Sequence, residues 1–444
     1  MAQIESYRPL RRATDGNAAP RLHDADVAGI PEVERKSKLD PIATIDETLM
    51  SAPPRTDHDL TWLDPQACDV QDFAQIVASE TSASECRFAA GIDRGVPLYD
   101  SVQLRARLRE PGVRRELLSE WVHVLGDGPG VLVLQRAFDD AALVDAVTAQ
   151  FHALIDDERG KTGGGDHFGK PGANDRVWNA LEKLCVLDPQ VFARYYANDV
   201  LALICEAWLG PGYQMTSQVN RVNPGGAAQS PHRDYHLGFL TAEVAARYPA
   251  HVHRLSPVLT LQGAVAHVDM PVESGPTLYL PHSHKYLPGY LVAGQPAFSA
   301  FFASHHVQLP LMKGDAVFFN PALLHAAGHN RTGHVKRTAN LLQVSSAFGR
   351  AMETVDRVRM CRSLYPALQR LAAQRSVNGE DLERAIACCA EGYSFPTDLD
   401  LDPPIGGLAP ETQQALMRRA LAEEWNAQRF EQALDAQAAK KRSR

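Results

Sequence analysis

The stretch from Gln229 to Phe239 reads QSPHRDYHLGF, and it is the most informative part of the chain. A loop rich in glycine and proline precedes it, and His232 and Asp234 stand two positions apart within it. Successive side chains of a strand point to opposite faces, so residues two apart share a face. We therefore expect His232 and Asp234 to offer an imidazole and a carboxylate to one point. A loop that leads into a short strand is also a usual place for functional residues.

A single His-x-Asp pair is weak evidence, because the chain contains 17 histidines and a second such pair occurs at His267 and Asp269. The second pair ends a long apolar run, 258–266, and leads directly into the turn 271–275. We interpret it as the end of a structural strand. An ordinary hydrogen-bonded histidine remains the alternative for either pair.

A third candidate ligand, His325, follows His232 after 93 residues. Two histidines and one carboxylate on one side of a metal form the facial triad of non-haem Fe(II) sites, which leaves the remaining positions open. A jelly roll needs about this much chain to bring two distant strands together. The sequence therefore predicts one iron site made by His232, Asp234 and His325.

Four motifs resemble the phytanoyl-CoA dioxygenase family over roughly residues 125–350. They are QSPHRDYHLGF at 229–239, ESGPTLYLPHSHK at 273–285, GDAVFFN at 314–320 and HAAGHN at 325–330. The resemblance implies an Fe(II)- and 2-oxoglutarate-dependent oxygenase, with O2 as the other cosubstrate, on a double-stranded β-helix. It also implies His232, Asp234 and His325 as the iron ligands.

The same resemblance implies a basic residue after the distal histidine that binds the far carboxylate of 2-oxoglutarate. The usual offset falls on Lys336, whereas the family usually has arginine, which stands next door as Arg337. Arginine grips a carboxylate with two parallel hydrogen bonds, and a shift of one residue reverses the face of a strand residue. We favour Arg337, with Lys336 as the alternative. Ala327 stands where relatives often carry a hydroxyl residue, and Thr277 is a candidate to supply that hydroxyl.

The bulk composition fits a cytoplasmic enzyme with a small-molecule substrate. The net charge of -8 and a pI near 6.1 argue against a nucleic-acid or anionic-membrane surface. The number of cysteines is seven, which is odd, and no Cys-x-x-Cys occurs, so we expect reduced thiols. The start lacks the pattern of a signal peptide, and no apolar run is long enough to span a bilayer.

The chain is expected to be an α+β protein in three parts. Residues 1–60 lack sustained periodicity and are interpreted as a flexible extension, 61–350 as a helical lead-in plus the β-helix, and 351–444 as a helical region packed on the core. Helices are expected at 112–122, from a cap at Asp139 onward, and over 176–209. Strands are expected at 130–134, 213–222, 231–235, 257–268, 276–281, 306–311, 315–319 and 337–347.

The tail is expected to contain amphipathic helices over 354–373 and 379–390, followed by a last helix. Met417, Leu421 and Trp425 recur every four residues and would form one apolar stripe. Such a stripe packs against the protein's own body or against a sister subunit, so a homodimer through these helices is possible.

Asp234 also bears on the reaction. Relatives that chlorinate have a small residue in its place, so its presence favours hydroxylation, or a desaturation or ring closure derived from it. Two other classes stay open, namely a cupin-type isomerase or hydrolase with another metal, and a non-catalytic protein with a metal in its core. The family's name does not identify the substrate, because no coenzyme-A pocket is evident in the sequence.

Overall fold

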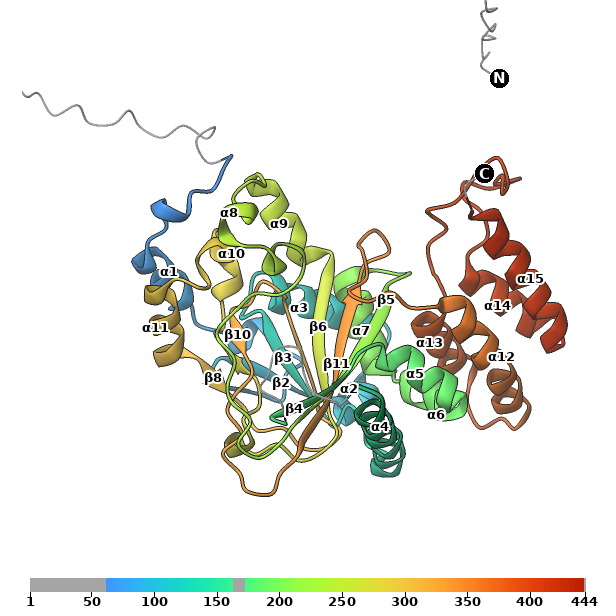
Figure 1. Cartoon of the computed structure of the whole chain (residues 1–444), viewed down its shortest axis with the longest axis horizontal. Helices are drawn as coiled ribbons and strands as arrows, with labels where there is room; N and C mark the ends of the chain where they lie inside the picture. The colour runs from blue at the N-terminus through green and yellow to red at the C-terminus, as the bar shows by residue number, and fades with distance from the viewer. Residues whose placement is uncertain (1–60, 163–171, 443–444) are drawn as a thin grey trace, which may run out of the picture. The chain divides into compact units, whose positions relative to one another are not determined.

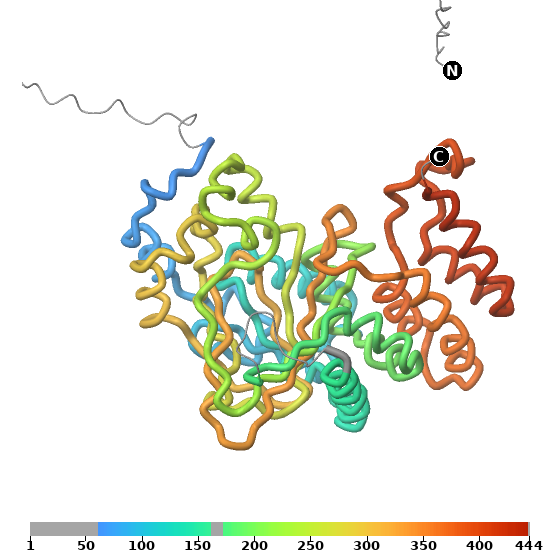
Figure 2. Tube along the Cα trace, in the orientation of Figure 1, coloured from blue at the N-terminus to red at the C-terminus, as the bar shows by residue number. Residues whose placement is uncertain are grey.

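The computed structural model describes residues 61–162 and 172–442, so the extension expected at 1–60 lies outside the described residues. Chain contacts place Arg55–Arg444 in one unit, the second of two along the chain. The division of the second unit at residue 350 stays a prediction. Figures 1 and 2 show the second unit with a sheet at its centre and helices around it.

Two sheets form the core. The large sheet has the strand order β1-β2-β3-β9-β6-β11-β5-β4, and its neighbours are antiparallel except β2 and β3. Its strands are β1 (Gly91–Asp93), β2 (Val96–Asp100), β3 (Val131–Gln135), β4 (Asn174–Val177), β5 (Gln214–Val222), β6 (Thr260–Ala266), β9 (Ala316–Phe319) and β11 (Arg337–Ser345). The small sheet has the order β10 (His325–Ala326), β7 (Leu278–Tyr279) and β8 (Val307–Gln308).

The large sheet is covered on both faces, which explains why its central strands are almost wholly buried. Alternate residues of β5 and β11 face opposite sides: Val219 and Leu342 join a large hydrophobic cluster with the helices. The other face carries Arg337 and Gln218 and borders a cavity. A second cluster joins this face to the small sheet, through Phe319 and Tyr279 among others. The arrangement is the predicted double-stranded β-helix with flanking helices.

Fifteen α-helices lie within the described ranges. Those before the site are α1 (Val70–Val77), α2 (Ser101–Arg107), α3 (Val113–Gly126), α4 (Ala141–Thr162), α5 (Ala180–Leu187), α6 (Pro189–Tyr196) and α7 (Asp199–Leu209). Four helices lie between residues 234 and 325, namely α8 (Ala242–Ala245), α9 (Ala250–Val258), α10 (Gly289–Val292) and α11 (Pro296–His305). The tail has α12 (Arg357–Ala373), α13 (Gly379–Cys389), α14 (Gln413–Ala422) and α15 (Ala427–Lys440). Each of these helices is too short or too polar to cross a bilayer.

Several expected boundaries need correction. Asp140, not Asp139, caps α4, because its carboxylate accepts the backbone N–H groups of Ala142 and Leu143. Residues 174–177 pair with β5 as strand β4, so the helical region expected from 176 begins only at Ala180. The strand expected at 257 begins at 260, after α9. The strand expected at 231–235 is a single bridge between His232 and His325.

The tail helices pack on the body of the protein. Helix α12 contacts α5 and α6, and Figure 1 shows α12–α15 gathered beside these helices. Met417 and Trp425 are buried in the same cluster as the sheet's helical face. Helix α14 ends at Ala422, so Trp425 lies in the turn before α15 and the stripe is not carried by one helix. The stripe is therefore used within the chain, and the homodimer stays a prediction.

Ending the chain at Gly349 is expected to prevent soluble folding. The change removes α12–α15 and exposes the apolar sides of α5 and α6, which share a cluster with Met360, Leu364 and Met417. Size-exclusion chromatography and thermal melts of the truncated chain measure this. A soluble truncated protein with the wild-type melting temperature would show that the tail is an independent appendage.

Glu353 gives the structure a predictable pH dependence. Its carboxylate accepts the backbone N–H of Asn179 at 2.7 Å, just before α5. Burial raises its pKa to about 7 from an ordinary value of 4.5, against the opposing effects of that bond, Lys183 and Arg176. A raised carboxyl pKa favours the folded state fully below pH 4.5, and the benefit is lost as pH rises towards 7.

Glu353→Gln should therefore unfold like the wild type near pH 4.5 and be more stable at pH 8. The expected gain at pH 8 is on the order of 1–3 kcal/mol, because one pKa unit corresponds to about 1.4 kcal/mol. Denaturant titrations at the two pH values measure it. A difference that is the same at both pH values would contradict the role of Glu353 ionisation.

Candidate metal centre and cosubstrate pocket

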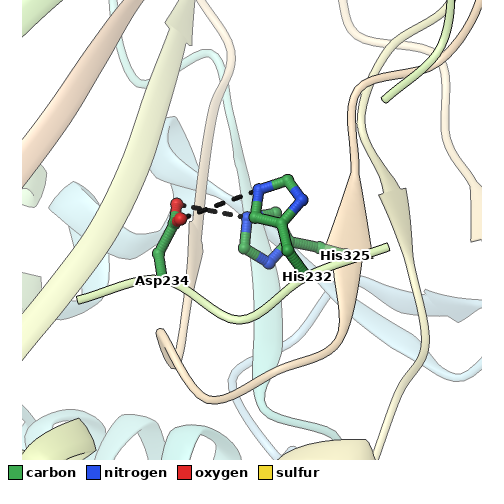
Figure 3. Close-up of side chains that lie close together, drawn as sticks. All are labelled: His232, Asp234 and His325. Atoms are coloured by element: carbon green, nitrogen blue, oxygen red, sulfur yellow. Dashed lines mark ion pairs between the residues drawn. The ribbon is translucent and has the colours of Figure 1, made fainter. Parts of the chain in front are cut away.

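His232, Asp234 and His325 come together on the cavity side of the large sheet. Their ligand atoms all lie within 4.8 Å of one another, and no other group of three such residues occurs among residues 61–162 and 172–442. The Asp234 carboxylate lies 3.7 Å from Nε2 of His232 and 3.5 Å from Nε2 of His325. Figure 3 shows His232 and Asp234 on one segment, with both imidazoles turned towards the carboxylate, and His325 on another.

Backbone hydrogen bonds place these side chains. The N–H of His232 donates to the carbonyl of His325 at 2.9 Å, and the N–H of His325 donates back at 3.1 Å. The N–H of Asp234 donates to the carbonyl of Pro321 at 3.1 Å. The expected sharing of a face by His232 and Asp234 is thus realised over one bridge, without a regular strand.

The hydrogen bonds of the two imidazoles leave the same nitrogen available on each. Nδ1 of His232 lies 2.8 Å from the carbonyl of Ser230, and Nδ1 of His325 lies 2.9 Å from that of Leu323. Because a carbonyl only accepts, each Nδ1 carries the proton and donates it. In the neutral form of each ring, Nε2 is then the nitrogen that can bind a metal, and it faces Asp234.

Asp234 is held as a carboxylate. Burial opposes its ionisation, but His325, His232 and the amide of Gln262 together hold its pKa well below the usual range. The amide Nε2 of Gln262 donates to Oδ2 of Asp234. The ring of Phe319 packs edge-on against His325, with centroids 4.8 Å apart. The site thus offers one carboxylate and two imidazole nitrogens, a donor set that suits a divalent transition metal.

A cavity of about 710 Å³ opens from the three residues, and Arg337 and Thr277 line it. The side chain of Arg337 is buried, and burial lowers its pKa to about 10, so it stays charged at neutral pH. Within the described ranges Arg337 has neither a carboxylate partner nor a hydrogen-bond acceptor. Lys336 is exposed and does not line the cavity. The geometry therefore favours Arg337 over Lys336 as the anchor of a carboxylate.

The second His-x-Asp pair lies apart from these residues. His267 is buried, with its two nitrogens 2.8 Å from the hydroxyl of Thr148 and 2.9 Å from that of Tyr195. Asp269 is exposed and accepts the backbone N–H of Lys313. This pair is structural, as the sequence predicts.

A row of polar side chains on the sheet was missed by the sequence analysis. Nη1 of Arg176 donates to Oε1 of Gln218 at 2.8 Å, and Nε2 of Gln218 donates to Oε1 of Gln343 at 3.1 Å. All three line the cavity, from β4, β5 and β11. The expected strands 213–222 and 337–347 carry polar residues on both faces, so they gave no clear signal for this row, and residue 176 was assigned to a helix.

The residues present fit iron and 2-oxoglutarate. The two free Nε2 atoms and the Asp234 carboxylate converge on one point, and the buried Arg337 guanidinium opens into the same cavity without a partner among the described residues. A dicarboxylic acid that reaches from the metal point to Arg337 would satisfy that charge.

Comparison with known protein families gives a match to part of the chain. The model of the phytanoyl-CoA dioxygenase family matches residues 127–339, which contain His232, Asp234, His325 and Arg337. No curated protein matches the chain. Solved structures that are similar include three described as non-haem or metal-bound enzymes with 2-oxoglutarate, and each is less than 20% identical.

The first of these structures is the epimerase SnoN with Fe3+, α-ketoglutarate and nogalamycin RO, with 18% identity, a TM-score of 0.38, and coverage of 54% of this chain and 85% of SnoN. The second is the non-haem α-ketoglutarate-dependent carbocyclase SnoK from nogalamycin biosynthesis. Its identity is 19%, its TM-score is 0.37, and the match covers 53% of this chain and 86% of SnoK. The third is HygX from Streptomyces hygroscopicus with nickel and 2-oxoglutarate. Its identity is 17%, its TM-score is 0.37, and the match covers 53% of this chain and 90% of HygX.

Proposed function

We propose that the chain is a 2-oxoglutarate-dependent non-haem iron enzyme that hydroxylates a small molecule at an unactivated C–H bond, because the model of the phytanoyl-CoA dioxygenase family matches residues 127–339. A desaturation or ring closure derived from the same oxidation is the related outcome. The observation that supports the proposal most is the convergence of His232, Asp234 and His325 beside the buried Arg337 in one cavity.

The residues of the site would have two roles, metal binding and cosubstrate binding. His232, Asp234 and His325 would hold the iron, and Arg337 would hold the far carboxylate of 2-oxoglutarate. When bound, iron and 2-oxoglutarate activate O2, so that one oxygen atom enters the substrate C–H bond and the other enters succinate, with release of CO2. Asp234 occupies the place that a halide needs in chlorinating relatives, which supports hydroxylation. The protein's part is to orient the substrate and exclude water.

The cavity also limits the substrate. Its volume of about 710 Å³ falls in the range of small-molecule sites and leaves room beside a five-carbon cosubstrate. The amide Nε2 of Gln343 has no acceptor within the described ranges, while its Oε1 is held by Gln218. A substrate oxygen near the reacting carbon would accept this N–H, since a donor left unsatisfied on binding is unfavourable. This supports an oxygenated compound rather than a plain hydrocarbon chain.

The test begins with an anaerobic titration of the protein with Fe(II) and 2-oxoglutarate, followed by absorption of the metal–cosubstrate charge-transfer band. Aerobic incubation with fractionated metabolite extract then measures succinate release. Substrate-dependent succinate supports the proposal. Turnover with zinc or manganese and without 2-oxoglutarate would instead indicate a cupin-type isomerase or hydrolase. Binding of metal and 2-oxoglutarate without succinate in any fraction would indicate a non-catalytic binding protein.

A further inference from the structure

Arg233 stands between two of the three metal-site residues but points away from them. Its side chain is buried, with 3% exposure, and it does not line the cavity that His232 and Asp234 line. Its Nη2 donates to the carbonyls of Ser283 and Tyr286, at 2.5 Å and 3.0 Å. Arg233 therefore ties the segment that carries His232 and Asp234 to the turn at 283–286.

The same turn holds the segment that carries the third residue. The backbone N–H of Leu324, next to His325, donates to the hydroxyl of Ser283 at 2.8 Å. The N–H of Leu280 also donates to the carbonyl of Leu324 at 3.0 Å. Ser283 thus accepts from both sides, from Arg233 with its carbonyl and from Leu324 with its hydroxyl. A chain of hydrogen bonds through Ser283 therefore links the segment that carries His232 and Asp234 to the segment that carries His325.

The surroundings of Arg233 are built around its guanidinium. A Cβ at Gly289 would lie 1.8 Å from Cζ of Arg233, so a side chain at this position would displace the guanidinium. The ring of Tyr290 lies 5.2 Å from the same carbon, at cation–π distance. Within residues 61–162 and 172–442 no carboxylate pairs with Arg233. An unpaired buried charge is unfavourable for stability, so stability alone gives a poor reason for arginine here.

We propose that Arg233 is the positioning residue of the metal centre, which fixes His232 and Asp234 relative to His325 through the turn at Ser283. The inference rests on the proposed function in taking these three residues as the metal ligands. Outer groups that orient ligands change metal affinity by about 10- to 100-fold when they are removed. Arg233 acts on the backbone of the ligand segment, whereas the usual outer group contacts the ligand side chain itself.

The experiment compares Arg233→Met, Arg233→Lys and the control Arg221→Met. Arg221 is a second buried arginine, 5% exposed, which pairs with Asp175 on the large sheet. The full-length apoprotein is titrated with Co(II), and three quantities are measured: the dissociation constant by chelator competition, the visible d–d spectrum, and the free energy of unfolding. No substrate is needed for any of these measurements.

Arg233→Met should bind Co(II) about 10- to 100-fold more weakly and with a changed d–d spectrum. Arg233→Lys keeps the charge and a donor, so its Co(II) affinity and its d–d spectrum should both lie closer to those of the wild type. Arg221→Met should lose stability yet keep the wild-type affinity and spectrum. Ser283→Ala removes only a hydroxyl, so it should fold if Arg233→Met does not, and it should weaken Co(II) binding in the same direction.

Arg233→Met, or Ser283→Ala in its place, with lower stability but wild-type affinity and spectrum would overturn the proposal and leave Arg233 a purely structural residue. Failure of the proposed function gives a different result. A wild-type protein that binds Co(II) and loses affinity in Arg233→Met, yet never turns over 2-oxoglutarate, keeps the positioning role and loses the oxygenase. A wild-type protein without Co(II) affinity would overturn both.

Discussion

Asp234→Ala is expected to abolish 2-oxoglutarate turnover and to weaken Fe(II) binding by about 100-fold or more, since even groups outside the ligand set change affinity by 10- to 100-fold. The carboxylate is the only negative group that faces the Nε2 atoms of His232 and His325 in the described site. Its loss removes one donor and the charge that offsets the cation. Anaerobic Fe(II) titration with chelator competition, together with succinate release, measures both effects.

The second His-x-Asp pair provides the matched control. Asp269→Ala removes an exposed carboxylate from the same kind of motif, whose main contact is the backbone N–H of Lys313. We expect wild-type iron binding in this variant, and also in His267→Ala, although the latter loses stability because His267 is buried. If Asp234→Ala retained full activity while Asp269→Ala lost it, the two pairs would have to exchange roles.

The common side of His232 and Asp234 was predictable because it depends on local sequence. The two-residue spacing of His232 and Asp234 fixes their common side in any extended segment, and a bridge is enough to realise it. A regular strand at 231–235 was a wrong prediction, because Tyr235 and His236 have φ values of 62° and 37°, in the left-handed region. No residue type in that segment reveals such a turn, since neither is glycine or asparagine.

The polar row was not predictable because it depends on pairing across the chain. Arg176 reaches Gln218 only because β4 pairs with β5, and Gln218 reaches Gln343 only because β5 pairs with β11. A strand of four residues beside a helix carries little periodic signal of its own. The sequence predicted β5 and β11 nearly to the residue, yet it held no information on which of their faces borders a cavity.

One residue of register decides which member of the basic pair faces the cavity. Lys336 and Arg337 were both open as anchors because the length of the turn at 331–334 sets which of them faces inward. In the structure Arg337 pairs with Val222 as the first residue of β11 and faces the cavity. Lys336 precedes the strand and is exposed. The side chain of a strand residue changes face with each step, so no intermediate position exists.

Arg337→Ala should raise the half-saturating concentration of 2-oxoglutarate by about 30-fold or more. Truncating one member of a buried charge pair costs roughly 2–5 kcal/mol, and each 1.4 kcal/mol is about tenfold. The free protein should lose little stability, because the guanidinium is buried without a carboxylate partner among the described residues and its removal also removes an unpaired charge. Titration of the Fe(II)–2-oxoglutarate absorption band and a thermal melt without ligands measure the two effects separately.

Lys336→Ala is the matched control, since it removes a neighbouring positive charge that lies outside the cavity. We expect its 2-oxoglutarate dependence to stay within about twofold of the wild type, because exposed charges are screened by water and salt. Arg337→Lys should have a half-saturating 2-oxoglutarate concentration between those of the wild type and Arg337→Ala, because lysine keeps the charge but not the two parallel hydrogen bonds. A large effect in Lys336→Ala with none in Arg337→Ala would move the anchor by one residue, and the face of β11 at its first residue would then be wrong.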